Sequence, residues 1–173
     1  LCRQLIRRFA KTKEFETHLV LDPGFSSTAE FLVTIIEMLT GRRPPEEARD
    51  WQMKEMVKNH LFKRGVDEKK TVALIIDEGQ KLPGFCLELL REFLNYETNE
   101  YKLLQIVIFA QREFEKTVRK YPNFTDRINL YHLLKPLSYS DTRQMIRFRL
   151  EKSSNSSKKR DLFTYPALWA IFR

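Results

Sequence analysis

The sequence has few of the residues that build disulfide frameworks or metal sites. Its two cysteines, Cys2 and Cys86, lie in apolar helical patterns without CxxC or other metal-ligand spacing. We expect them to be buried, reduced thiols of a cytosolic protein. The three histidines, His18, His60 and His132, are separated by predicted strands and helices and also show no ligand spacing. We therefore expect the histidines to be packing or surface residues rather than metal ligands.

Long hydrophobic runs are absent as well. The longest apolar runs, such as 31–36 and 72–76, are far shorter than the ~20 residues that cross a bilayer. No signal-peptide pattern opens the sequence. The 173 residues, of which 42% are hydrophobic, can still bury one substantial core. We expect one soluble domain, followed by the start of a second.

Basic residues outnumber acidic ones, and the formal net charge is +8. This charge favours an anionic partner, which could be a nucleotide, a nucleic acid or membrane headgroups, and charge alone does not choose among them. A solvated basic surface is the alternative.

Helical and strand patterns alternate along the chain, which predicts helices packed around a largely parallel sheet. Short apolar or β-branched runs predict strands at 18–22, 71–76, 103–109 and 130–134. Helical spacing predicts helices at 1–9, 28–40, 44–65, 85–94, 113–119, 123–128, 142–150 and 163–172. The second of these helices is framed by a capping box, Ser27 with Glu30, and by Gly41 as its C-terminal stop. The polar stretch 152–160 predicts a surface loop or hinge.

The strongest chemical signal is the apolar strand 73–76, which delivers Asp77 and Glu78 at its carboxyl end. Open parallel sheets bind their ligands at this edge. Asp77 is suited to hold Mg²⁺, a hard ion that prefers oxygen ligands, and Glu78 to position and deprotonate an attacking water. The alternative is that both carboxylates only end a strand and cap the next turn.

Further short motifs surround and follow this strand. They are IIDEGQKL at 75–82, LELLR at 87–91, FLNYET at 93–98, KLLQIV at 102–107, RI at 127–128, LKPL at 134–137, DT at 141–142 and RL at 149–150. Together they resemble the ExeA-like AAA+ ATPases of the general (type II) secretion pathway, along nearly the whole chain.

The resemblance implies an α/β fold of the P-loop NTPase AAA+ type, a parallel sheet flanked by helices. It implies an AAA+ core over residues 1–137 and the beginning of a helical lid over 138–173. Residues 1–5 resemble the helix that follows the Walker A P-loop, so the family's first strand and P-loop are not in the printed sequence. Because the loop's amides and lysine normally hold the phosphates, we expect this chain to bind ATP weakly and not to hydrolyse it. We also expect strands 103–109 and 130–134 to lack a shared neighbour.

The resemblance assigns two further site residues. Gln111 resembles the sensor that contacts the γ-phosphate or orients water, although the family usually has Gly-Gln-Pro-Glu-Leu where this chain has Ala-Gln-Arg-Glu-Phe at 110–114. Arg127 lies where AAA+ modules place the arginine finger, which stabilises developing phosphate charge in the neighbouring subunit. The alternatives are a solvent-facing glutamine and a surface ion pair of Arg127 with Asp126 or another carboxylate.

The function implied is ATP hydrolysis, with Mg²⁺, by a homo-oligomer at the cytoplasmic face of the bacterial inner membrane. Hydrolysis would be coupled to assembly of secretion machinery through a membrane protein partner. A less favoured alternative is a DNA-binding AAA+ regulator of the transposition type, supported by Arg143, Arg147, Arg149, Lys152 and the basic cluster 158–160. A degenerate module that hydrolyses nothing would follow if the full gene also lacked the P-loop.

Overall fold

The computed structural model describes residues 2–100, 102–153 and 162–173. The chain divides into two compact units, Leu1–Asn129 and Leu130–Arg173, which we describe separately. The predicted division into a core over 1–137 and a lid over 138–173 stays a prediction. None of the helices in the described part of the chain combines the length and the apolar character needed to cross a membrane.

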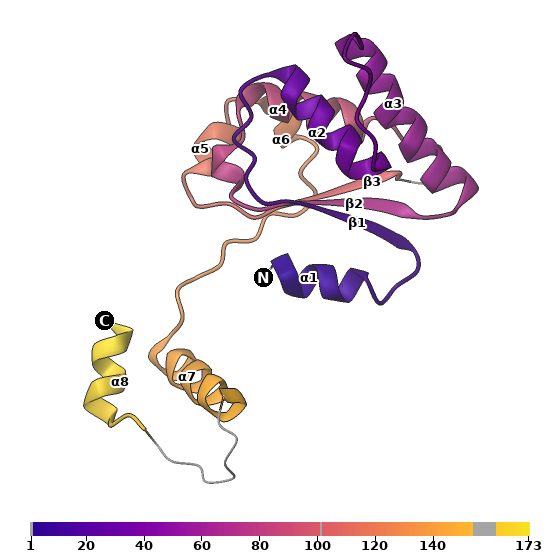
Figure 1. Ribbon diagram of the computed structural model, residues 1–173. Coiled ribbons are helices and arrows are strands. Elements are labelled where there is room, and N and C mark those ends of the chain that lie inside the picture. The colour runs from indigo at the N-terminus through magenta and orange to yellow at the C-terminus, as the bar shows by residue number, and fades with distance from the viewer. Residues whose placement is uncertain (1, 101, 154–161) are drawn as a thin grey trace. The chain divides into compact units, whose positions relative to one another are not determined.

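The larger unit is built on three parallel strands in the order β1-β2-β3 (Figure 1). The strands are β1 (Phe15–Val20), β2 (Thr71–Ile76) and β3 (Leu104–Ile108). Val20 lies opposite Ile76, and Ile76 lies opposite Ile108, so the three strands end at the same edge. The α/β fold with a parallel sheet flanked by helices is therefore confirmed.

Helices cover both faces of this sheet. They are α1 (Cys2–Phe9), α2 (Thr28–Thr40), α3 (Asp50–Phe62), α4 (Gly84–Leu94), α5 (Phe114–Val118) and α6 (Pro122–Thr125). Figure 1 shows α1 on one side of the sheet and α2, α3 and α4 on the other. A π-helical turn, Lys63–Asp67, extends α3 toward β2.

The core lies mainly between β2 and the helices α2, α3 and α4. Val72, Leu74 and Ile76 of β2 belong to one buried cluster with side chains of these helices. Ala73 and Ile75 point to the opposite face by strand alternation and are buried too. β2 thus has the two covered faces that its uninterrupted apolar run predicts.

The second face of the sheet is covered by α1, whose apolar side packs against β1. The ring of Phe9 stacks on that of Phe15, with centroids 4.8 Å apart. Cys2, at the start of α1, is buried, whereas Arg3, Arg7 and Arg8 are exposed. The apolar spacing at the start of the sequence therefore marks the buried side of a helix, as predicted.

The smaller unit contains α7 (Tyr139–Ser153) and α8 (Tyr165–Phe172). The Arg143 guanidinium donates a hydrogen bond to the Tyr165 hydroxyl at 3.1 Å, and the rings of Tyr139 and Phe172 meet edge to face at 5.8 Å. Among the described residues of this unit, only Thr142 and Leu168 are buried. The smaller unit by itself therefore has little hydrophobic core.

The prediction of a last strand at 130–134 is wrong. No strand is found between residues 129 and 138, and the Leu130 side chain is 85% exposed. A strand needs a neighbour for its backbone hydrogen bonds, and β3, the edge of the sheet, pairs only with β2 among the described residues. The apolar run at 130–134 has the composition of a strand, but among the described residues it has no neighbouring strand to pair with.

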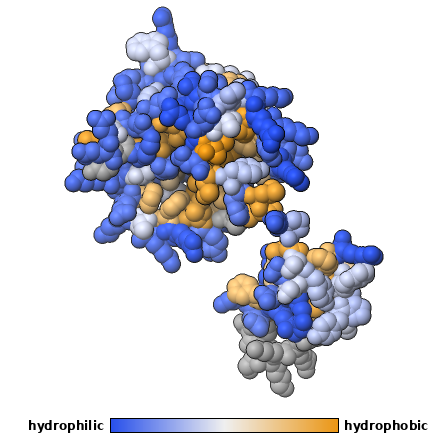
Figure 2. Space-filling model, turned by 180° about the vertical axis from the view of Figure 1, so that it is seen from behind, coloured by the Kyte–Doolittle hydropathy of each residue, from blue (hydrophilic) through white to orange (hydrophobic). Residues whose placement is uncertain are grey.

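Apolar side chains also reach the surface in both units. Figure 2 shows orange apolar groups within the mostly blue surface. In the larger unit the exposed large apolar side chains are those of Leu21, Trp51, Val66 and Ile128. In the smaller unit they include Leu130, Tyr131, Leu134, Phe148, Tyr165, Trp169 and Ile171.

Candidate active site

Polar side chains gather where the three parallel strands end. The backbone N–H of Asp77 donates to the Val20 carbonyl, and that of Phe109 donates to the Ile76 carbonyl, each at 2.8 Å, so the ladders continue past the strands. As a result Asp22, Asp77, Glu78 and Gln111 follow strand ends at one edge. Three of the four predicted site residues are thus brought to the carboxyl edge of the sheet, where ligands of such sheets bind.

Asp77 is partly buried, and two neighbours fix its carboxylate. Its Oδ1 accepts the backbone N–H of Glu78 at 3.0 Å. The thiol of Cys2 lies beside it: burial, and then the hydrogen bond to Asp77, raise the pKa of this thiol. Asp77 and the first turn of α1 therefore adjoin one another. The sequence alone gave no signal for this contact.

Glu78 has a strained backbone, with φ 52° and ψ 40° in the left-handed region. Its Oε2 lies 2.5 Å from Nζ of Lys81, which is also 3.3 Å from Oδ1 of Asp22. The hydrogen bonds to Glu78 and then to Asp22 raise the pKa of the Lys81 ammonium. Lys81 thus joins the end of β1 to the turn that carries the predicted base.

Gln111 is exposed in the turn between β3 and α5. Its carbonyl accepts the backbone N–H of Phe114 at 3.0 Å. Its own backbone N–H donates to Oε1 of Gln80 at 3.1 Å. The turn after β3 is therefore bonded to the turn after β2.

Arg127 lies just beyond α6, near the end of the larger unit. Its side chain is exposed, and its backbone N–H donates to the Phe124 carbonyl at 3.0 Å. No carboxylate in the described part of the chain forms an ion pair with Arg127, so the alternative of a pair with Asp126 finds no support there. No described contact joins Arg127 to the edge that carries Glu78.

The donor set at this edge suits a magnesium ion better than a transition metal. Across residues 2–100, 102–153 and 162–173, no group of three His, Cys, Asp or Glu side chains is placed to hold a metal ion. Magnesium is usually held by one or two carboxylates, with phosphate and water oxygens completing its shell. The single carboxylate of Asp77 fits that requirement.

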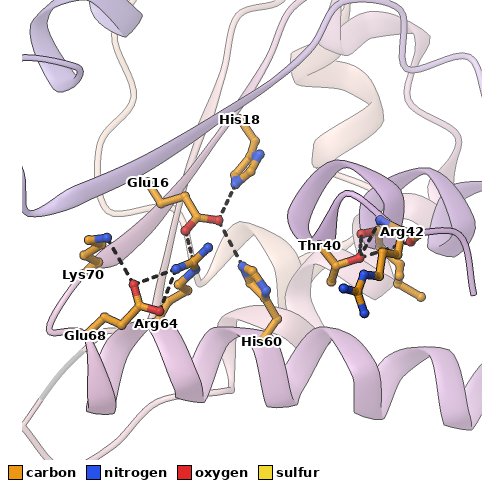
Figure 3. A network of polar contacts seen from close by, with 9 residues as sticks. Glu16, His18, Thr40, Arg42, His60, Arg64, Glu68 and Lys70 are labelled. Atoms are coloured by element: carbon orange, nitrogen blue, oxygen red, sulfur yellow. Dashed lines mark hydrogen bonds and ion pairs between the residues drawn. The ribbon is translucent and has the colours of Figure 1, made fainter.

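A second polar cluster, missed by the sequence analysis, lies between β1 and α3 (Figure 3). Oε1 of Glu16 accepts hydrogen bonds from Nε2 of His18 at 2.8 Å and Nε2 of His60 at 3.0 Å. Oε2 of Glu16 lies 2.5 Å from Nε of Arg64. Burial opposes ionisation of Glu16, but the two histidines and the charge of Arg64 outweigh it and lower the pKa of this carboxyl.

This cluster lies toward the amino end of β1, whereas the candidate site lies at the carboxyl ends of the three strands. The cluster therefore connects α3 to the sheet and is not part of the candidate site. Its signal in the sequence is spacing: Glu16 and His18 are two apart on a strand, and His60 and Arg64 are four apart on a helix. Spacing alone does not show that this face of the strand packs against this face of the helix.

The basic residues that support the DNA-binding alternative lie in the smaller unit. Arg143 is engaged with Tyr165, and Nζ of Lys152 lies 5.8 Å from the centroid of the Phe148 ring. The basic cluster 158–160 lies outside the described residues.

Comparison with known proteins places this geometry in a family. A family model described as AAA domain matches residues 1–118. General secretion pathway protein A of Aeromonas hydrophila is 35% identical over 122 residues, which are 69% of this chain and 21% of that protein. The chain therefore spans about a fifth of the length of this relative.

Solved structures agree on the fold. The ORC2 protein of Aeropyrum pernix, in its ADPNP and ADP complexes, matches with a TM-score of 0.61 and 17% identity over 86% of this chain and 40% of that one. CDC6P from Pyrobaculum aerophilum matches with a TM-score of 0.67 and 12% identity over 87% of this chain and 39% of that one. At these identities the likeness shows the fold, which is of the AAA+ type.

Proposed function

Because this chain belongs to the AAA domain family, we propose that it is the ATPase module of a protein that couples ATP hydrolysis to the assembly of bacterial secretion machinery. The observation that carries the proposal is the pair Asp77 and Glu78 at the carboxyl edge of the parallel sheet. The similarity to general secretion pathway protein A supports the link to secretion. We further propose that the partner is a membrane protein of the secretion pathway, reached from the cytoplasmic face of the inner membrane, as the resemblance to the ExeA-like family implies.

The proposed chemistry is attack of water on the γ-phosphate of ATP, which breaks the bond from the γ-phosphorus to the β,γ-bridging oxygen and releases ADP and phosphate. Asp77 would hold Mg²⁺, which when bound would neutralise charge on the phosphate oxygens. Glu78 orients the water and accepts its proton, and Gln111 contacts the γ-phosphate or the same water. Arg127 reaches the nucleotide of a neighbouring copy in a homo-oligomer, where its fixed charge stabilises the transition state.

The test is Glu78→Gln in the full-length protein. The amide keeps the shape of the side chain but cannot accept a proton, so we expect ATP binding to be retained and turnover to fall by about 100-fold or more. Glu47→Gln, an exposed glutamate in the loop before α3, is the matched control and should leave turnover unchanged. Wild-type turnover in Glu78→Gln would remove Glu78 from the catalytic role.

Asp77→Ala tests the metal assignment in the same protein. Mg²⁺ should raise the affinity of the wild type for ATP but not that of Asp77→Ala. In EDTA, the two proteins should bind ATP with equal affinity. Titration calorimetry with and without Mg²⁺ measures both values. Equal gains from Mg²⁺ in mutant and wild type would contradict the assignment.

A further inference from the structure

The turns after β2 and β3 are bonded to each other by a pair of hydrogen bonds. The backbone N–H of Gly79 donates to the Phe109 carbonyl at 2.8 Å. The backbone N–H of Gln111 donates to Oε1 of Gln80 at 3.1 Å. Because a backbone N–H is a donor, the side-chain amide of Gln80 must turn its oxygen, and not its NH2 group, toward Gln111. The first turn carries Glu78 and the second carries Gln111.

Close packing fixes the backbone from which Gln80 reaches out. A Cβ at position 79 would lie 2.2 Å from Cγ2 of Ile108 and 3.2 Å from Cβ of Ala110, so only glycine allows this approach. The turn is also closed by the Lys81 N–H, which donates to the Glu78 carbonyl at 2.8 Å. Gln80 itself is partly buried. Its side-chain amide is therefore presented to the turn after β3 from a fixed backbone.

We propose that Gln80 is the positioning residue that sets Gln111 relative to Glu78, an inference that rests on the function proposed above. Gln111 is exposed, and in the described contacts its link to the turn after β2 runs through the Gln80 carbonyl. Two groups that act on one water and one γ-phosphate need a fixed separation, because a misplacement of about 1 Å can reduce a rate by about 100-fold. The Gln80 carbonyl supplies that constraint.

The test compares two substitutions of Gln80 in the full-length protein. Gln80→Leu removes the acceptor and keeps the approximate size, whereas Gln80→Glu keeps an oxygen that accepts the same N–H. We expect Gln80→Leu to lower kcat about tenfold or more, with the KM for ATP and the melting temperature close to wild type. We expect Gln80→Glu to retain most of kcat. Gln105→Leu, at an exposed position in β3, controls for the loss of an amide elsewhere.

Three results would overturn the inference. They are an unchanged kcat in Gln80→Leu, an equal loss in Gln80→Leu and Gln80→Glu, and a loss of kcat accompanied by an equal change in KM or by a lower melting temperature. Glu78→Gln, measured in parallel, separates this inference from the proposed function. If Glu78→Gln retains turnover, the catalytic role proposed for Glu78 fails, and with it the role of Gln80; if it does not, and Gln80→Leu has wild-type kcat, only the role of Gln80 fails.

Discussion

At the scale of single residues, surroundings give three carboxylates different roles. Glu78 is about half exposed and meets one flexible ammonium, that of Lys81. Asp77 is partly buried, next to a backbone N–H and a thiol. The side chain of Glu16 is only 16% exposed and meets three basic side chains from β1, α3 and the π-helical turn. The first two are accessible to a ligand, whereas the third holds the fold together.

Glu16→Gln should therefore destabilise the protein. The substitution leaves Arg64 and two histidines without their common carboxylate, and hydrogen bonds to charged groups contribute about 2 kcal/mol each. We expect the free energy of unfolding to fall by about 2 kcal/mol at pH 7, measured by urea denaturation. Glu55→Gln, which removes the exposed pair with Lys58, should change it by about 0.5 kcal/mol or less. Equal effects would contradict the stabilising role of Glu16.

The same network predicts a pH dependence. The pKa of Glu16 is lowered in the folded state from its ordinary value of 4.5, so the unfolded chain binds a proton there more readily. Its contribution to stability is then fully present above about pH 4.5 and is lost as the pH falls through the lower folded-state pKa. The difference between wild type and Glu16→Gln should shrink over that acid range. A difference that stays constant from pH 7 to pH 3 would contradict the linkage.

At the scale of elements, the turn after β2 matters as much as the strand itself. β2 is the central strand, so its end lies between the ends of β1 and β3 and can be bonded to both. Lys81 makes the contact toward β1 and Gln80 the contact toward β3. Gly79 allows the second contact because it has no side chain to hold β3 away.

Gly79→Ala should therefore disturb both the fold and the site. The added methyl group would overlap Cγ2 of Ile108, and overpacking of this kind costs about 1–3 kcal/mol. We expect a loss of stability in that range, measured by urea denaturation, together with reduced ATP turnover. Gly24→Ala is the control, because its methyl would lie 3.6 Å from the nearest atom, Oδ1 of Asp22. Equal stability of the two variants would contradict this prediction. It would show that the end of β3 can move to accommodate the added methyl group.

At the scale of the whole molecule, the proposed role of Arg127 requires a second copy of the chain. The described contacts do not join Arg127 to the edge that carries Glu78, although Arg127 is exposed and without an ion pair among the described residues. Such a residue can act on the nucleotide of a neighbouring copy, as an arginine finger does. This places the test of Arg127 in the oligomer.

Arg127→Ala and Glu78→Gln in the full-length protein should each be inactive alone and active when mixed. In the mixture, an Arg127→Ala copy supplies an intact base while its Glu78→Gln neighbour supplies the arginine. With random assembly of equal amounts, about a quarter of the interfaces combine the two intact groups in this way. We expect up to about a quarter of wild-type turnover, measured as phosphate release. Inactive mixtures, with mixed oligomers detected by energy transfer between labels, would return Arg127 to a surface role.

Elements that have local causes can be predicted from the amino-acid sequence. The bounds of β2, 71–76, match the prediction because an apolar, β-branched run covered on both faces is a strand in any such sheet. α2 begins and ends as predicted: Oγ of Ser27 accepts the N–H of Glu30 at 3.1 Å, and Gly41 ends the helix with φ 70°. The positions of Asp77 and Glu78 at a strand end followed from the same local pattern.

Features that depend on partners distant in the sequence appear only in the folded chain. Residues 130–134 have the composition of a strand, but a strand forms only against a neighbour, so that prediction failed. β1 begins at Phe15 rather than at the predicted position 18 because Glu16 finds a partner, His60, on α3, which lets a polar residue enter an edge strand. The bond between Gln80 and Gln111 joins residues 31 positions apart. Local propensity cannot encode such contacts, since they exist only after the chain has brought their elements together.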